Sequence, residues 1–124
     1  MCEKIPAIKV ILLPRDTNAM GTIFGGVLLS HVDLASAVEA RKAGPHRYVT
    51  KAMREVEFHE PVFLGDIVSF YTETVRVGRT SITVKVSVEA ERWGAGRGEK
   101  VMVTEAEVVL VAVDESGRPR PIQG

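Results

Sequence analysis

The strongest constraint on the fold is a strict alternation of apolar and polar residues from Ser81 to Arg92. The apolar positions are Ile82, Val84, Val86 and Val88, and the polar positions between them are Thr83, Lys85, Ser87 and Glu89. A period of two places all the apolar side chains on one face of an extended strand. The pattern therefore predicts a half-buried antiparallel strand, and one side of its sheet must be covered by another element.

Four further runs of β-branched and aromatic residues predict the other strands of this sheet. They span Ala7 to Leu13, Val49 to Glu60, Ile67 to Val77 and Val101 to Asp114. The last run becomes apolar on both faces from Val108, which is typical of a central strand. The glycine-rich segment Trp93 to Gly98 leads into a strand and not into a helix, so it lacks the context of a dinucleotide-binding loop. We expect it to be the loop between the last two strands.

One segment, from about Gly25 to Ala43, predicts a long helix. It is rich in Leu and Ala, and Gly44-Pro45 closes it; Arg41 and Lys42 are expected in its last turn, where the helix dipole favours cations. Because the helix is almost apolar all round, we expect it to be buried against the sheet and against a neighbouring subunit. The expected fold is α+β, with one long central helix wrapped by a curved antiparallel sheet of about five strands, in a single domain over residues 1–124.

Charge and composition exclude several classes of function. The 16 Lys and Arg balance the 16 Asp and Glu, so the chain lacks the positive field that nucleic-acid binding needs. It shows neither a membrane span nor a secretory signal, which predicts a cytoplasmic protein without a membrane partner. Cys2 has no intrachain disulfide partner. His31, His46 and His59 lie too far apart for a paired metal motif, so no metal site is expected.

The most informative segment runs from Asp16 to Gly26 and leads into the helix that contains Asp33. The consecutive glycines Gly25 and Gly26 leave backbone N–H groups uncovered at the positive end of the helix dipole, which suits an oxyanion. Asp33 is the only carboxylate between Gly25 and Val38, and it lies on nearly the same helix face as Gly26. The alternative remains open that the glycines only allow close packing and that Asp33 is solvated or paired with a cation.

These residues, together with others in the same order, resemble one family of enzymes over most of the chain. The sequence is similar to the hot-dog acyl-CoA thioester hydrolases of the YciA type, relatives of the cytosolic long-chain acyl-CoA hydrolases. The resemblance extends from about Leu13 to Ile122. It rests on Leu13-Pro14, Asp16-Thr17-Asn18, Gly21, Ile23-Phe24-Gly25-Gly26, Asp33, Phe58 with Pro61, Gly65-Asp66, Gly78 with Thr80-Ser81, Thr104-Glu105-Ala106 and Val111-Ala112-Val113-Asp114 with Gly117 and Pro119.

The resemblance implies both an assembly and a set of site residues. It implies a homo-oligomer in which two subunits form a continuous sheet, usually as a trimer of dimers. Asp33 and Asn18 would carry the reaction from opposite subunits, and the Gly26 N–H, next to Gly25, would face the thioester oxygen. The segment containing Arg79, Thr80 and Ser81 would contact the phosphate or pantetheine part of coenzyme A.

Two positions depart from the family pattern. Phe24 stands where many relatives have His, and we expect it to reshape the acyl pocket while leaving catalysis intact. Arg54 stands where a small or acidic residue is expected, and the sequence does not explain it.

Hydrolysis of acyl-CoA thioesters to free acid and coenzyme A is the function we expect from these residues. Gly26 would stabilise the oxyanion, Asp33 would act as general base or nucleophile, and Asn18 would position the water or the carbonyl. No cofactor is needed, because a thioester is already an activated acyl group.

Two other functions remain open at this point. One is a non-catalytic acyl-CoA sensor or assembly module that uses the same pocket. The other is a hydratase, which would need an acid and base pair; His31 should point away from Asp33 on the helix. The sequence does not determine the acyl-chain length, which depends on the packing of Phe24, Leu28, Val56, Phe58 and Phe63.

Overall fold

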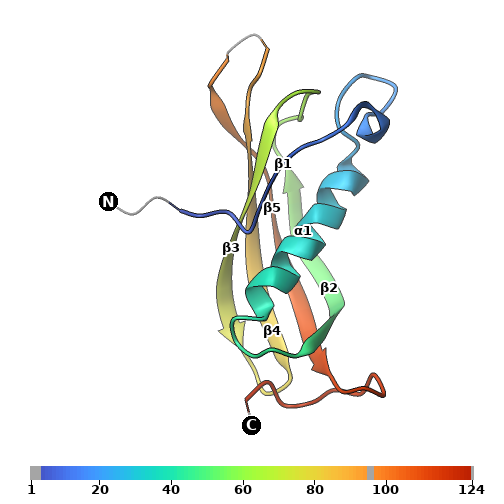
Figure 1. Ribbon diagram of the computed structural model, residues 1–124, viewed down its shortest axis with the longest axis vertical. Coiled ribbons are helices and arrows are strands. Elements are labelled where there is room, and N and C mark those ends of the chain that lie inside the picture. Colours follow the sequence, from blue (N-terminus) through green and yellow to red (C-terminus); the bar gives the residue numbers. More distant parts are fainter. Residues whose placement is uncertain (1–3, 95–96, 124) are drawn as a thin grey trace.

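The computed structural model describes residues 4–94 and 97–123. Cys2 and the central residues Ala95 and Gly96 of the predicted glycine-rich loop lie outside the described residues. The elements, in chain order, are strand β1 (Ile8–Ile11), a short 3-10 helix η1 (Pro14–Asp16), helix α1 (Gly25–Ala40), and strands β2 (Arg47–Phe58), β3 (Ile67–Val77), β4 (Ser81–Glu91) and β5 (Lys100–Val113). One helix lies across one face of the sheet that the strands form (Figure 1).

The five strands form one antiparallel sheet in the order β1-β3-β4-β5-β2. Strand β5 lies between β4 and β2, which confirms that the run apolar on both faces is a central strand. The alternating residues of β4 also behave as predicted, because Ile82, Val84, Val86 and Val88 are fully buried. The expected fold class, one helix beside a five-stranded antiparallel sheet, is confirmed.

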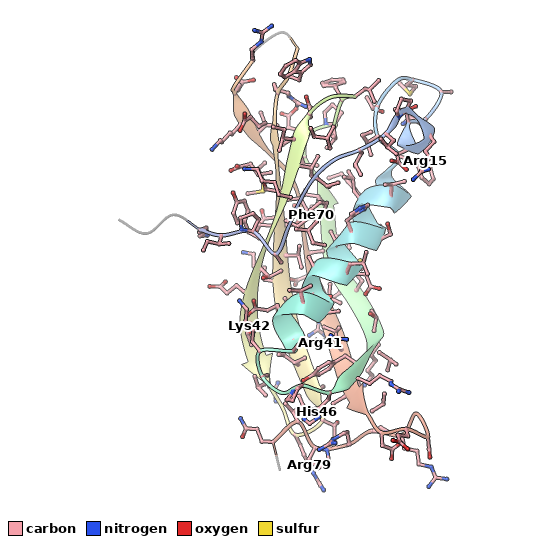
Figure 2. All side chains as sticks on the ribbon, in the orientation of Figure 1. Arg15, Arg41, Lys42, His46, Phe70 and Arg79 are labelled. Carbon is pink, nitrogen blue, oxygen red and sulfur yellow. The ribbon has the colours of Figure 1, made fainter. Side chains whose placement is uncertain are left out.

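Helix α1 covers the sheet with one of its sides. Leu28, Val32 and Ala35 are buried and join the core that the inner faces of β3, β4 and β5 provide. Phe70 of β3 fills the space between helix and sheet (Figure 2). The other side of α1 carries Leu34 and Val38, which are 58% and 48% exposed in the single chain. Burial against the sheet is therefore confirmed, whereas burial against a neighbouring subunit stays a prediction.

The helix ends earlier than the sequence predicts. It stops at Ala40, Arg41 is its C-cap, and Lys42 lies beyond it. The prediction that both cations lie in the last turn is therefore wrong. After Ala40 the backbone tightens: the Lys42 N–H donates to the Glu39 carbonyl at 3.1 Å and the Ala43 N–H to the Ala40 carbonyl at 3.0 Å. The cause lies in Gly44-Pro45, because proline restricts the residue before it and cannot continue a helix.

Three connections meet at the end of the molecule where α1 begins. The loop between β2 and β3, the hairpin between β4 and β5 and the segment around η1 all lie at this end (Figure 1). The turn between β3 and β4 lies at the opposite end. Among the described residues, no helix combines the length and the apolar character needed to cross a membrane; the cytoplasmic location stays a prediction.

Candidate functional site at the start of helix α1

The start of α1 is held by backbone hydrogen bonds from two directions. The Phe24 N–H donates to the Asp16 carbonyl at 2.9 Å, and the Ile23 N–H donates to the Val62 carbonyl at 2.8 Å. Phe24 is the N-cap residue in extended conformation, and its side chain makes no capping hydrogen bond. The N–H groups of Gly25 and Gly26 have no acceptor among residues 4–94 and 97–123. Two uncovered donors therefore stand at the positive end of the helix dipole.

An aromatic ring lies beside each of these glycines. A methyl group on Gly26 would approach the Phe24 ring to 2.8 Å, and one on Gly25 would approach the Phe58 ring to 3.5 Å. Both rings are exposed in the single chain. A side chain at Gly26 would thus force the exposed Phe24 ring to move, whereas one at Gly25 would make an ordinary contact. Gly26 also offers a free amide, so the two interpretations drawn from the sequence are compatible.

Asn18 holds the loop that precedes the helix. Its Oδ1 accepts the N–H groups of Met20 at 2.9 Å and Thr22 at 3.2 Å, and its Nδ2 donates to Thr22 Oγ1 at 2.8 Å. Because a side-chain amide has two N–H donors, one N–H of Asn18 remains for another partner. The expected role of Asn18 in positioning a water or a carbonyl stays a prediction, and this remaining donor is the group that would perform it.

Asp33 is half-buried at the edge that α1 forms with β2. The Thr50 hydroxyl of β2 donates a hydrogen bond to Asp33 Oδ1. No Lys or Arg pairs with Asp33 in the described part of the chain, so the alternative of a structural ion pair finds no support there. Sequence reasoning missed Thr50, because it is 17 residues from Asp33 and becomes its neighbour only when β2 folds beside the helix.

Arg79, Thr80 and Ser81 lie far from the start of α1 within one chain. Arg79 and Thr80 lie in the turn between β3 and β4, and Ser81 begins β4. Figure 2 shows Arg79 near His46 at the end where α1 finishes. The backbone there is used structurally: the Thr80 carbonyl accepts the Ala112 N–H at 2.8 Å, and the Arg79 carbonyl accepts the Ile122 N–H at 2.9 Å. The structure of one chain does not bring this turn to Asp33 or Gly26, and its role in coenzyme A binding stays a prediction.

His31 and His59 both contact other protein groups and lie apart from Asp33. His31 is stacked on Phe70 with ring centroids 5.6 Å apart, and its Nδ1 lies 2.9 Å from the Val27 carbonyl. It therefore turns toward the core, away from Asp33, as the helical geometry predicted. His59 is exposed, 3.8 Å from carboxylate oxygens of both Glu57 and Glu105. Among the described residues, no group of three or more His, Cys, Asp or Glu is arranged to hold a metal ion.

The structure also places Arg54 and residues that the sequence analysis expects to shape the acyl pocket. Arg54 lies on the outer face of the sheet with its Nε 3.4 Å from Glu107 Oε1 in the next strand, so it has a carboxylate partner. Of the residues expected to shape the acyl pocket, Leu28 is part of the core, whereas Phe24, Phe58 and Phe63 remain exposed at the end where α1 begins.

Comparison with known proteins identifies relatives over nearly the whole chain. The thioesterase superfamily model matches residues 20–93. An acyl-CoA thioester hydrolase YciA of Salmonella typhimurium is 37% identical over 93% of this chain and 87% of its own length.

Solved structures of thioesterases are similar to this chain over nearly its whole length. A hexameric hot-dog fold thioesterase of Campylobacter jejuni is 47% identical with a TM-score of 0.90, over 95% of this chain and 90% of that one. A hexameric broad specificity acyl-coenzyme A thioesterase, solved as an Asp-to-Ala mutant, is 36% identical with a TM-score of 0.92, over 97% of this chain and 87% of that one.

Proposed function

The chain belongs to the thioesterase superfamily, with the hot-dog fold, and from this premise we propose that it hydrolyses acyl-CoA thioesters to a free acid and coenzyme A. The observation that carries the proposal is the start of α1. The free N–H groups of Gly25 and Gly26 offer an oxyanion site, and the same helix carries the half-buried Asp33. The relatives named as acyl-CoA thioester hydrolases supply the substrate class.

The spacing of these groups along α1 favours a site shared by two subunits. Asp33 follows Gly26 by seven residues, which corresponds to about 10 Å along a helix. To contact both groups of one chain, a thioester carbonyl and its attacking water would have to lie almost in line along the helix surface. We propose that Asp33 of one subunit faces the helix start of a second subunit, in an oligomer like those of the hexameric relatives. The exposed Leu34 and Val38 beside Asp33, and the free edge of β2, are the surfaces such a contact would bury.

The reaction then follows from the groups present. The helix-start amides stabilise the negative charge that develops on the thioester oxygen. Asp33 takes a proton from a water molecule, the water oxygen bonds to the acyl carbon, the carbon–sulfur bond breaks, and the proton passes to the leaving sulfur. Thr50 holds Oδ1 of Asp33 by its hydrogen bond, which leaves Oδ2 available to accept from the water. Direct attack by Asp33 through a transient anhydride is the alternative course. Both courses use only protein groups and water.

The experiment is release of free thiol from acyl-CoAs of increasing chain length, read with a thiol reagent. Asp33→Asn retains the shape of the side chain and deletes the charge, so we expect kcat to fall about 100-fold or more if Asp33 is the general base. Glu73→Gln is the control, because Glu73 is an exposed carboxylate on β3. Unchanged turnover of a folded Asp33→Asn enzyme refutes the assignment, and acyl-CoA binding without thiol release favours the sensor alternative.

A further inference from the structure

A buried ion pair lies at the end of the molecule where α1 begins. Asp66 and Arg92 have side chains only 2% and 9% exposed, and Arg92 Nη1 lies 2.6 Å from Asp66 Oδ2. The same Nη1 donates to the Pro61 carbonyl at 2.9 Å. Removing two charges from water is costly, and an apolar pair of similar volume is often equally stable. Stability is therefore a weak explanation for this pair, and the groups it holds are a better guide to its role.

The pair fixes the turn between β2 and β3 to the end of β4. Asp66 accepts the N–H groups of Phe63 at 2.9 Å and Trp93 at 3.2 Å, in addition to the bond from Arg92. The Arg92 guanidinium lies 4.8 Å from the centroid of the Phe63 ring. Gly65 has a φ of +92°, and a methyl group there would approach the Trp93 ring to 3.1 Å. The turn at residues 61–66 is thus held by charge, by backbone bonds and by ring contact.

The turn at residues 61–66 also holds the loop that precedes α1. The Val62 carbonyl accepts the Ile23 N–H at 2.8 Å, and Thr22 forms a β-bridge with Phe63. Thr22 is also the residue that Asn18 binds, through its backbone and its side chain. Ile23 precedes Gly25 by two residues. A continuous series of hydrogen bonds and backbone contacts therefore runs from the ion pair to the proposed oxyanion amides and to Asn18.

We propose that Asp66 and Arg92 are positioning residues: their ion pair sets the direction of the helix-start amides and of Asn18 through the turn at residues 61–66. This inference rests on the proposed thioester hydrolysis. An oxyanion site acts only when its donors are fixed at hydrogen-bond distance from the developing charge, and a displacement of about 1 Å can lower a rate up to 100-fold. A turn held only by neutral loop contacts would let the amides move relative to a substrate bound by other parts of the protein.

The test compares Arg92→Met, Asp66→Asn and the milder Arg92→Lys with the control Glu39→Gln. The control also loses a buried charge, but at the other end of α1, where Glu39 accepts hydrogen bonds from Thr72 and Thr74 of β3. We expect Arg92→Met and Asp66→Asn to lower kcat about 10-fold or more with KM changed less than about twofold, because only transition-state contacts are lost. The control also lowers the melting temperature but should keep kcat within about twofold.

Arg92→Lys should give an intermediate kcat. Its ammonium can reach Asp66, but it lacks the planar guanidinium that lies on Phe63 while binding Pro61. All rates are measured well below the melting temperature of each variant. Hydrogen exchange of peptides covering residues 17–27, read by mass spectrometry, should be faster in the Arg92 and Asp66 variants than in the control. If Arg92→Met and Asp66→Asn do not fold, the kcat of Arg92→Lys and its hydrogen exchange over residues 17–27 test the inference.

Three results overturn the inference: a wild-type kcat in folded Arg92→Met, a kcat loss in Glu39→Gln as large as in the Arg92 variants, or unchanged exchange over residues 17–27. If the wild-type enzyme releases no thiol, the proposed function fails. The exchange comparison still decides separately whether the pair orders the start of α1.

Discussion

Glu39 offers a quantitative test of how α1 is attached to the sheet. Its side chain is 10% exposed, and its two oxygens accept hydrogen bonds from Thr72 Oγ1 at 2.9 Å and Thr74 Oγ1 at 2.8 Å, with Lys42 Nζ 3.1 Å away. Burial raises the pKa of Glu39, but the hydrogen bond from Thr74, the Lys42 ammonium and the hydrogen bond from Thr72 outweigh it and lower the pKa below its ordinary 4.5. Glu39 is therefore ionised and bound in the folded protein.

Glu39→Gln keeps the shape and one acceptor oxygen, so one threonine hydrogen bond becomes neutral. The other oxygen becomes an NH2 group, and the threonine hydroxyl facing it must turn to accept a neutral hydrogen bond. A hydrogen bond to a charged group contributes about 1.5–3 kcal/mol and a neutral one about 1, so the change should cost about 1–4 kcal/mol for the two bonds together. The ion pair with Lys42 adds little, because Lys42 is 73% exposed. For a chain of this length the melting temperature should fall by about 3–5 °C for each kcal/mol, measured at one fixed protein concentration.

The pH dependence has a definite sign. A group whose pKa is lower in the folded than in the unfolded state stabilises the fold above its unfolded pKa, here 4.5, and this stabilisation is lost as the pH falls through the folded pKa. The melting temperatures of wild type and Glu39→Gln should thus differ at pH 7 and converge below pH 4.5. Scanning calorimetry between pH 7 and 3.5 measures both. Equal melting temperatures at pH 7, or a difference that stays constant down to the lowest pH, refute the reasoning.

Two further predictions concern the proposed active site. Thr50→Val keeps the side-chain shape but removes the hydroxyl that donates to Asp33 Oδ1, so kcat for acyl-CoA hydrolysis should fall about 10-fold, whereas Thr50→Ser should retain most of the rate. A wild-type kcat in Thr50→Val contradicts a role for this bond. Gly26→Ala places a methyl group 2.8 Å from the exposed Phe24 ring, which must move over the helix-start amides. We expect kcat to drop about 10-fold with little change in melting temperature. Adding Phe24→Ala to this variant should restore part of kcat. If kcat is not restored, the Phe24 ring is not what obstructs the amides.

Local patterns determined the elements and one face of the core. The alternation in β4 predicted four valine and isoleucine side chains that are fully buried, because a period of two depends only on the extended backbone. The glycines at the start of α1 and Gly44-Pro45 after it placed the helix within a few residues of its observed bounds. The error at its end, where Arg41 and Lys42 leave the last turn, comes from the tightening before Pro45, which a helical pattern does not show.

The tertiary structure decided which of these elements touch and therefore which residues can act together. Thr50 binds Asp33 across 17 residues, and Asp66 binds Arg92 across 26, because the sheet order puts β2 at one edge and joins the turn after it to the end of β4. The family resemblance assigned both residues 79–81 and the start of α1 to substrate binding. In the single chain these two segments lie at opposite ends of the molecule. Periodicity and turn residues report on neighbours a few positions apart, whereas these contacts depend on chain reversals that bring distant segments together.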